Sequence, residues 1–116
     1  MNAYEVRDGL TRTANPVMAR AMSESDLLSN VTTLARRMGL LVHHETDSRK
    51  SPRGFLDLVV VGKRVVFIEL KTETGRLRPE QETWLTRLTR AGQDARVIRP
   101  RDWLDGTVER LLKEIR

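Results

Sequence analysis

Two short apolar runs separated by a turn signal constrain the fold of this chain more than any other feature. The runs extend from Leu58 to Val61 and from Val65 to Ile68, with Gly62-Lys63 between them. β-branched runs of this length on either side of a turn predict the two antiparallel strands of a hairpin. Because both runs are apolar at consecutive positions, we expect both faces of the sheet to be covered, as in a layered α/β domain.

Three charged residues, Asp57, Glu69 and Lys71, border or interrupt these apolar runs. A carboxylate inside a covered sheet costs several kcal/mol unless a partner or a metal compensates it. Glu69 and Lys71 lie two positions apart, so their side chains project from the same face of one strand, and Asp57 starts the neighbouring strand. Two carboxylates and an ammonium group on one face predict a divalent-cation site with a cationic side chain beside it.

The register of the hairpin decides whether the two carboxylates can meet. A strict two-residue turn would pair Val61 with Arg64 and would send Asp57 and Glu69 to opposite faces, because a shift of one residue inverts the side chains. A shared site therefore requires either a three-residue loop, with Val61 opposite Val65, or a bulge in one strand. We predict one of these two arrangements.

Two amphipathic segments are expected to form helices around the hairpin. Ser23 is a good N-cap for a helix that ends at Gly39. Pro79 suits the first position of a second helix, although Arg78 before it is a poor N-cap and predicts a loose start. The apolar face of that second helix comprises Trp84, Leu85 and Leu88, with the polar Gln81 among them.

The remaining apolar segments complete an α/β pattern. Residues 40–45 and 95–99 are predicted strands, and residues 103–115 follow helical spacing with Gly106 as a possible break. The resulting order is αβββαβα. Strands joined through a helix predict a central mixed four-stranded sheet flanked by helices on both sides.

Composition narrows the functional classes. The chain of 116 residues fits one domain, and the absence of cysteine excludes disulfides, thiolate zinc sites and a cysteine nucleophile. No apolar run approaches membrane-spanning length and no signal peptide is visible, so we expect a cytoplasmic protein, plausible for a bacterial or phage-infected cell. The net charge is +5, and most of the basic residues are arginine, which binds phosphate through paired hydrogen bonds.

Two polar loops beside the charged triplet carry five of the 21 basic residues. Each loop is either a solvated connection or a phosphate-binding segment, and we favour phosphate binding for the first because it ends at Asp57. The candidate nucleic-acid-binding residues are Ser48, Arg49, Lys50, Ser51 and Arg53 in the first loop and Arg76 and Arg78 in the second.

Several motifs in order resemble the VRR-NUC family of the PD-(D/E)XK nuclease superfamily, over roughly residues 24–103. The residues that carry the resemblance are Asp47-Ser48-Arg49, Ser51, Gly54-Phe55-Leu56-Asp57-Leu58, Ile68-Glu69-Leu70-Lys71-Thr72, Gly75, Gln81, Trp84, Leu85, Ala91-Gly92 and Arg99-Pro100. Leu56 departs from the pattern, since the family usually has proline there, and this puts the local backbone geometry in doubt.

The resemblance implies a restriction-endonuclease-like three-layer core and metal-dependent hydrolysis of DNA. Asp57, Glu69 and the Leu70 carbonyl would bind Mg²⁺ or Mn²⁺, and Lys71 would assist the attacking water or the phosphate. Glu24 would complete the site, and on this resemblance we favour that role over the alternative, a carboxylate favoured at a helix N-terminus. Gln81 would form either a structural hydrogen bond or a contact near Lys71 and the substrate.

Family members of this size look like homodimers that cut branched DNA such as four-way junctions. We therefore expect residues 1–22 to form an N-terminal arm, flexible or in contact with a second subunit, and residues 23–116 to form a single nuclease domain without a small-molecule cofactor. The alternatives are a catalytically inactive basic DNA-binding module, a nuclease that acts on single strands or flaps, and a structural α/β protein in which Glu69 and Lys71 simply pair.

Overall fold

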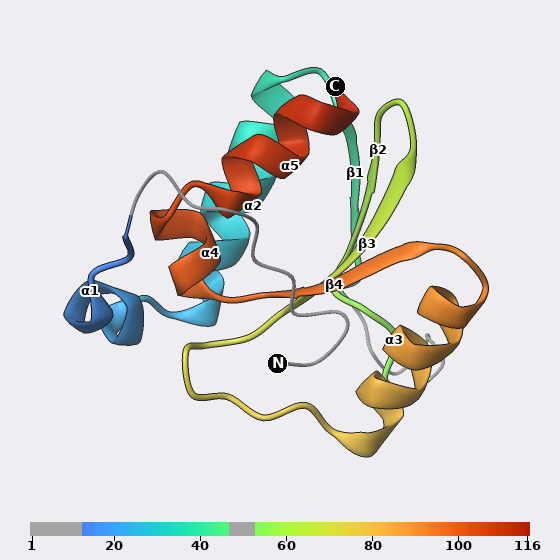
Figure 1. Ribbon diagram of the computed structural model, residues 1–116, viewed down its shortest axis with the longest axis horizontal. Helices are drawn as coiled ribbons and strands as arrows, with labels where there is room; N and C mark the ends of the chain where they lie inside the picture. The colour runs from blue at the N-terminus through green and yellow to red at the C-terminus, as the bar shows by residue number, and fades with distance from the viewer. Residues whose placement is uncertain (1–12, 47–52) are drawn as a thin grey trace.

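A four-stranded mixed sheet forms the centre of the fold in a computed structural model, which describes residues 13–46 and 53–116 (Figure 1). The strands lie in the order β1-β2-β3-β4; β1, β2 and β3 pair antiparallel, and β4 is parallel to β3. The elements are α1 (Pro16–Ala21), α2 (Glu24–Arg37), β1 (Leu41–His44), β2 (Leu58–Val61), β3 (Val65–Leu70), α3 (Pro79–Arg90), β4 (Asp94–Ile98), α4 (Pro100–Leu104) and α5 (Thr107–Ile115).

The predicted mixed sheet and the predicted order of elements are confirmed, with two additions. A short helix, α1, precedes α2, and the last predicted helix is divided into α4 and α5. The division falls at Gly106, whose φ of 90° is a left-handed conformation that other residues rarely adopt. None of the described helices has both the length and the apolar character that crossing a bilayer requires.

The hairpin of β2 and β3 has the three-residue loop that a shared carboxylate site requires. Val61 pairs with Val65 and Leu58 pairs with Ile68. Inside the loop, the Gly62 amide donates a hydrogen bond to the Arg64 carbonyl at 3.1 Å. Side chains at odd positions of β2 and of β3 therefore point to the same face of the sheet.

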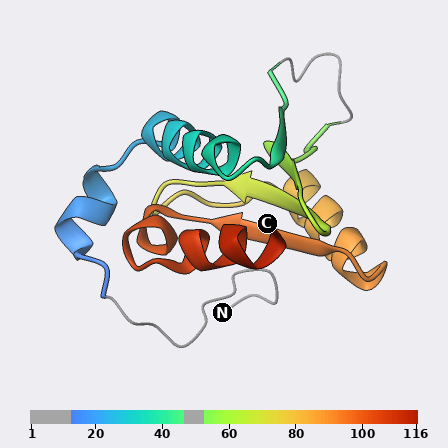
Figure 2. The same ribbon diagram turned by 90° about the horizontal axis from the view of Figure 1, so that it is seen from above.

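Helices α2 and α5 cover one face of the sheet, with α4 beside them (Figures 1 and 2). The α2 helix begins at a capping box in which the Ser23 hydroxyl accepts a hydrogen bond from the Asp26 amide at 3.0 Å, as its N-cap sequence predicts. The main core lies between these helices and the sheet, and its fully buried members include Leu27, Val31, Leu58, Val60, Val66, Ile68, Val108 and Leu112.

Helix α3 packs on the opposite face and covers only part of it. A second, smaller core there comprises Leu56, Leu85, Ala95 and Val97. Toward β1 none of the described elements covers this face, and Leu41 is 72% exposed. The expectation that both faces are covered is therefore correct only near β3 and β4, because α3 is the one described helix that packs on this side and it lies against β4.

Helix α1 lies at one end of the molecule, where Ala19 is buried and the helix contacts α4 (Figure 1). It belongs to the segment 1–22 that the sequence predicts as an arm. Residues 1–12 of that segment lie outside the described residues, so the arm and the boundary at residue 23 stay predictions.

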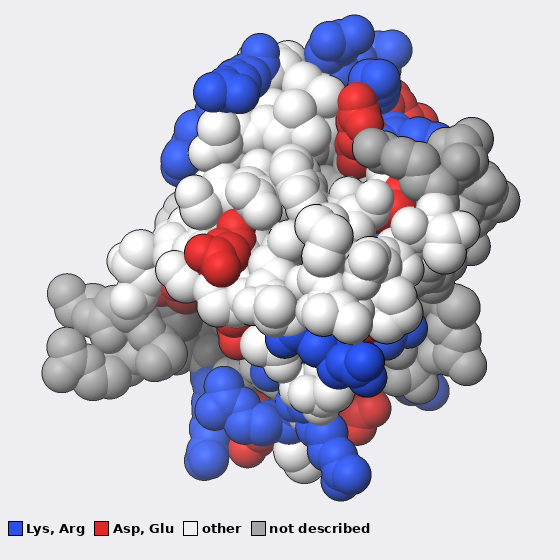
Figure 3. Space-filling model, turned by 90° about the vertical axis from the view of Figure 1, so that its left-hand side faces the viewer, with Lys and Arg blue, Asp and Glu red and all other residues white. Residues whose placement is uncertain are grey.

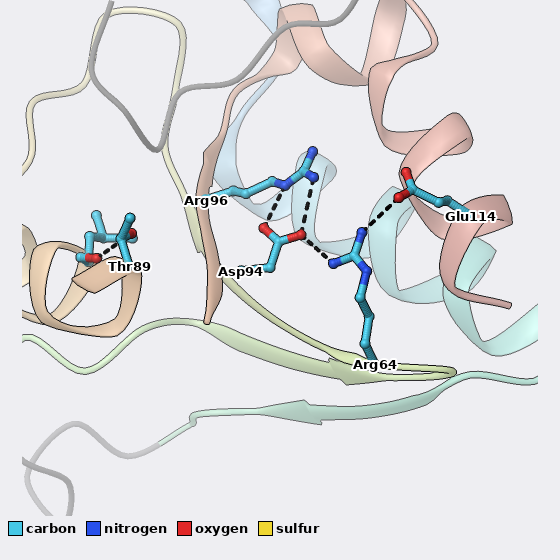
Figure 4. Close-up of polar contacts among 6 residues, drawn as sticks. Arg64, Thr89, Asp94, Arg96 and Glu114 are labelled. Atoms are coloured by element: carbon cyan, nitrogen blue, oxygen red, sulfur yellow. Dashed lines mark hydrogen bonds and ion pairs between the residues drawn. The ribbon is translucent and has the colours of Figure 1, made fainter. Parts of the chain in front are cut away.

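An ionic cluster joins the hairpin loop to the start of β4 and to α5 (Figure 4). Asp94 at the start of β4 accepts hydrogen bonds from Arg96, at 2.8 and 3.1 Å, and from Arg64 in the hairpin loop. Arg64 also donates to Glu114 on α5 at 3.0 Å. Partial burial alone would raise the pKa of Asp94, but the hydrogen bonds from Arg96 and Arg64 outweigh it and lower that pKa.

Asp94→Asn should lower the free energy of unfolding by about 1 kcal/mol at pH 7, a modest value because Arg64 is 40% exposed and solvent screens the pair. The folded-state pKa of Asp94 lies below the unfolded value, so this contribution is present above about pH 4 and disappears as the pH falls further. Urea unfolding of both proteins at pH 7 and pH 3 should give a larger difference at pH 7 than at pH 3. Equal differences at the two pH values would contradict the ionic role.

Candidate active site

Asp57 and Glu69 face each other at the end of the hairpin away from its loop. Asp57 directly precedes β2, Glu69 lies on β3, and the three-residue loop sends both side chains to the α3 side of the sheet. The Leu70 amide donates a hydrogen bond to Asp57 Oδ2 at 2.8 Å, which anchors the first carboxylate beside the second. The sequence prediction that these two groups share one site is consistent with this register.

The carboxylate of Glu69 is held by two neighbours on one of its oxygens. Gln81 Nε2 donates to Glu69 Oε2 at 2.8 Å, and Lys71 Nζ lies 3.6 Å from the same oxygen. Glu69 is only 1% exposed, and its Oε1 has no hydrogen-bond partner among the described residues. A buried carboxylate oxygen without a partner is costly, so this atom calls for compensation by a cation or by a proton.

Gln81 has a structural and a site role at once. Its Oε1 accepts a hydrogen bond from the Arg78 amide at 2.9 Å while its Nε2 donates to Glu69. The first bond caps the start of α3, which the poor N-cap Arg78 predicts to be loose. The amide group therefore joins the helix start to β3, which is the structural alternative for Gln81, and its contact with substrate stays a prediction.

The pKa of Glu69 is raised to about 8, mainly by burial and next by the nearby charge of Asp57. Lys71 acts in the opposite direction, but its effect is smaller than that of Asp57. Two carboxylates that face each other in a low-dielectric site resist ionising together. A bound divalent cation would remove this conflict, because it compensates both negative charges.

Glu24, the first residue of α2, lies at the edge of this site. It is exposed as a residue, yet partial burial of its carboxylate and the charge of Asp57 raise its pKa, while Lys71 and Arg78 act in the opposite direction. These influences show that Glu24 lies within electrostatic range of the pair. Its role as a metal ligand stays a prediction.

The donor set fits a hard divalent cation with an incomplete protein shell. Within residues 13–46 and 53–116, no three His, Cys, Asp or Glu side chains cluster closely enough to form a complete cage. Two facing carboxylates and the unpartnered Oε1 of Glu69 nevertheless offer the oxygen ligands that Mg²⁺ and Mn²⁺ prefer, and Mg²⁺ commonly keeps several waters.

The segment before Asp57 is held against α3 by contacts between Gly54-Phe55 and the part of α3 that contains Trp84. Trp84 Nε1 donates to the Arg53 carbonyl at 3.2 Å, and the rings of Phe55 and Trp84 meet edge to face with centroids 5.0 Å apart. Gly54 has φ +83°, and a Cβ on it would lie 2.6 Å from the carbonyl carbon of Glu80. A glycine is therefore required here both for its backbone angle and for its close approach to the helix.

Gly54→Ala should lower the free energy of unfolding by about 3 kcal/mol, because the left-handed backbone and the clash with Glu80 both oppose it. Gly92→Ala is the matched control: its φ is +85°, but nothing lies within 4 Å of the added Cβ, so it should cost only about 1 kcal/mol. Urea unfolding measures both values. Equal costs would show that the approach of Gly54 to α3 is unimportant.

Two arginines at the end of β4 hold the loop that follows Lys71, a role that the sequence analysis missed. Arg99 Nη1 donates to the carbonyls of Thr72 and Gly75 at 2.7 and 2.8 Å, and Arg101 binds the Glu73 carboxylate through its Nε and its backbone amide. The order of the strands could have predicted this contact. Because β3 and β4 are parallel, they end at the same edge of the sheet, and an arginine after β4 can reach the loop after β3.

The predicted nucleic-acid-binding residues divide into two groups. Arg53, Arg76 and Arg78 are exposed, and Arg53 Nε lies 3.3 Å from Glu80 Oε1. Ser48, Arg49, Lys50 and Ser51 lie outside the described residues. In the sequence, Arg53 lies shortly before Asp57, and Arg76 and Arg78 lie shortly after Lys71. The exposed arginines therefore flank the candidate site residues along the chain.

A mixed four-stranded sheet flanked by helices, with a carboxylate directly before β2 and another on β3, is compatible with the restriction-endonuclease-like fold. The sequence model of the VRR-NUC domain matches residues 2–102, so this chain belongs to the VRR-NUC family. A solved structure described as a VRR-NUC domain is similar in fold, with a TM-score of 0.64 and 21% sequence identity. The match covers 83% of this chain and all of the other. A comparison with curated proteins found no similar sequence.

Proposed function

We propose that this protein is a divalent-metal-dependent endonuclease that hydrolyses phosphodiester bonds in structured DNA. Membership of a nuclease family makes DNA the expected substrate class. The observation that carries the metal-dependent mechanism is the facing pair of Asp57 and Glu69, with Lys71 adjacent and with a buried oxygen of Glu69 that has no partner among the described residues.

Each side chain of the site has its own role in the proposed reaction. Asp57 and Glu69 would hold Mg²⁺ or Mn²⁺, with the Leu70 carbonyl and Glu24, directly or through water, as further donors. When bound, such a cation polarises a phosphate and acidifies a bound water. Lys71 orients or deprotonates the attacking water, or neutralises the charge that develops on the phosphate. Gln81 keeps the Glu69 carboxylate in a fixed orientation through its 2.8 Å hydrogen bond.

The substrate is proposed to be recognised by backbone shape rather than by sequence. The exposed Arg53, Arg76 and Arg78 suit contacts with phosphates, which position DNA without reading bases. A homodimer would bring two such sites to one branched molecule, and paired nicks would then resolve a four-way junction. Light scattering on the free protein and on its junction complex measures the number of subunits.

Cleavage of a labelled panel tests this proposal: single strand, duplex, flap and four-way junction, each with Mg²⁺, with Mn²⁺ and with EDTA. We expect cleavage only with a divalent cation, and faster cleavage of the branched substrates than of the plain duplex. Binding without cleavage under every metal condition would establish the alternative, a catalytically inactive DNA-binding module.

A further inference from the structure

Trp84 lines an open groove on the side of α3, separate from the carboxylate pair. The groove has a volume of about 410 Å³ and is lined by Thr83, Trp84, Arg87 and Leu88. Trp84 is half-buried, and Arg87 is exposed at the groove's edge. The lining thus combines a large aromatic surface with a neighbouring cation.

The indole of Trp84 is held in one orientation. Its Nε1 donates to the Arg53 carbonyl at 3.2 Å, and the Phe55 ring packs against it at an interplanar angle of 75°. Both partners lie on the short segment that leads to Asp57. An aromatic ring fixed in this way is a preformed surface, because little side-chain freedom is lost when a ligand stacks on it.

A second, polar pocket lies at Arg53, whose carbonyl accepts the hydrogen bond from Trp84. It measures about 260 Å³ and is lined by Arg53, Gly54, Arg78 and Glu80. Glu80, Trp84 and Arg87 follow one another at helical spacings of four and three residues, so they lie along one side of α3. Figure 3 views the molecule from the side opposite α3, and basic side chains gather there at the lower end and at the top of the molecule.

We propose that the Trp84 groove binds an unpaired nucleobase of the DNA substrate by stacking, with Arg87 and Arg53 contacting the adjoining phosphates. Stacking on an aromatic ring beside cationic groups is the general means by which proteins bind single-stranded nucleic acid. The proposal rests on the proposed function and specifies its substrate: DNA in which unpaired bases lie next to the cleaved strand, as in a flap, a gap or an open branch.

Binding measured in EDTA tests the groove without any cleavage. In the variant Trp103→Phe, Trp84 is the sole tryptophan of the chain, and titration with oligothymidylate should quench its fluorescence. In the otherwise unchanged protein, Trp84→Leu should weaken binding of labelled oligothymidylate about tenfold or more, by anisotropy, and binding of a blunt duplex less than twofold. Trp84→Phe, which keeps an aromatic ring, should retain most of the single-strand affinity.

Two arginines on α3 distinguish a contribution of the groove to binding from a general effect of positive charge. Arg87 lines the groove, whereas Arg90, three residues further along α3, does not. Arg87→Ala should therefore weaken single-strand binding more than Arg90→Ala, although both variants lose one positive charge. Thermal unfolding of all variants identifies any loss of folded protein, and the quenching experiment stays decisive if Trp84→Leu does not fold.

Absence of quenching, or an equal loss of single-strand and duplex binding in Trp84→Leu, would overturn the proposal and leave Trp84 as a core residue. Quenching by single-stranded RNA or by an acidic peptide as strong as that by DNA would overturn the choice of ligand. Because these measurements need no metal, a protein that binds oligothymidylate through Trp84 but never cleaves DNA would refute the proposed catalysis and retain this groove.

Discussion

Asp57→Asn should lower the rate of DNA cleavage at least about a thousandfold while changing DNA affinity less than about threefold. Asparagine has nearly the same shape, and its side-chain oxygen can still accept the hydrogen bond that Asp57 receives from the Leu70 amide at 2.8 Å. The substitution therefore removes a negative charge from the proposed cation site without removing the contact that stabilises the hairpin end.

Lys71→Ala should cause a comparable loss of cleavage, because its ammonium group lies 3.6 Å from Glu69 Oε2, beside the same site. Single-turnover cleavage of a flap or junction with Mn²⁺, together with binding measured in EDTA, separates chemistry from affinity. Lys113→Ala is the matched control, since Lys113 lies on α5 and pairs with Glu109. Unchanged cleavage in both Asp57→Asn and Lys71→Ala would rule out this active site.

The second large expected effect is a dependence of stability and metal binding on pH. Glu69 has a pKa of about 8 in the folded protein, well above the value of 4.5 for an exposed glutamate. Between these values the folded state retains a proton that the unfolded chain has lost. The free energy of unfolding of the metal-free protein should therefore fall as the pH rises from 5 to 8 and should level off above 8.

Magnesium should reverse this trend, because the cation binds the ionised carboxylate and displaces its proton. We expect the apparent Mg²⁺ affinity to rise by up to about tenfold per pH unit between pH 6 and pH 8, and the increase in melting temperature on adding Mg²⁺ to be larger at pH 8. Thermal unfolding at fixed ionic strength, with and without Mg²⁺, measures both effects.

Glu69→Gln provides the control for this prediction. Its amide does not ionise, so the metal-free variant should lose the fall in stability between pH 5 and pH 8 and should respond little to Mg²⁺. An unaltered pH profile in Glu69→Gln would assign the effect to another group, such as Glu24, whose pKa is also raised.

The sequence predicts the elements of this fold well because their signals are local. The N-cap Ser23, the break at Gly106 and the apolar runs of the hairpin each act within a few residues, and the structure confirms them. The register of the hairpin does not follow from these local signals, since a two-residue and a three-residue loop both fit the same sequence. A carboxylate pair could be expected only because one of those registers brings Asp57 and Glu69 together.

The chain's sequence by itself determined the hairpin and the order of the strands, and it places Glu69 and Lys71 on one face because they lie two positions apart on a strand; the roles of Asp57, Glu69 and Lys71 in a site stay predictions. Tertiary structure alone decided that Gln81 joins α3 to Glu69, that Arg99 holds the loop after Lys71, and that α3 leaves Leu41 uncovered. These contacts join residues far apart in the chain, so they depend on how the helices pack against the sheet rather than on any local pattern.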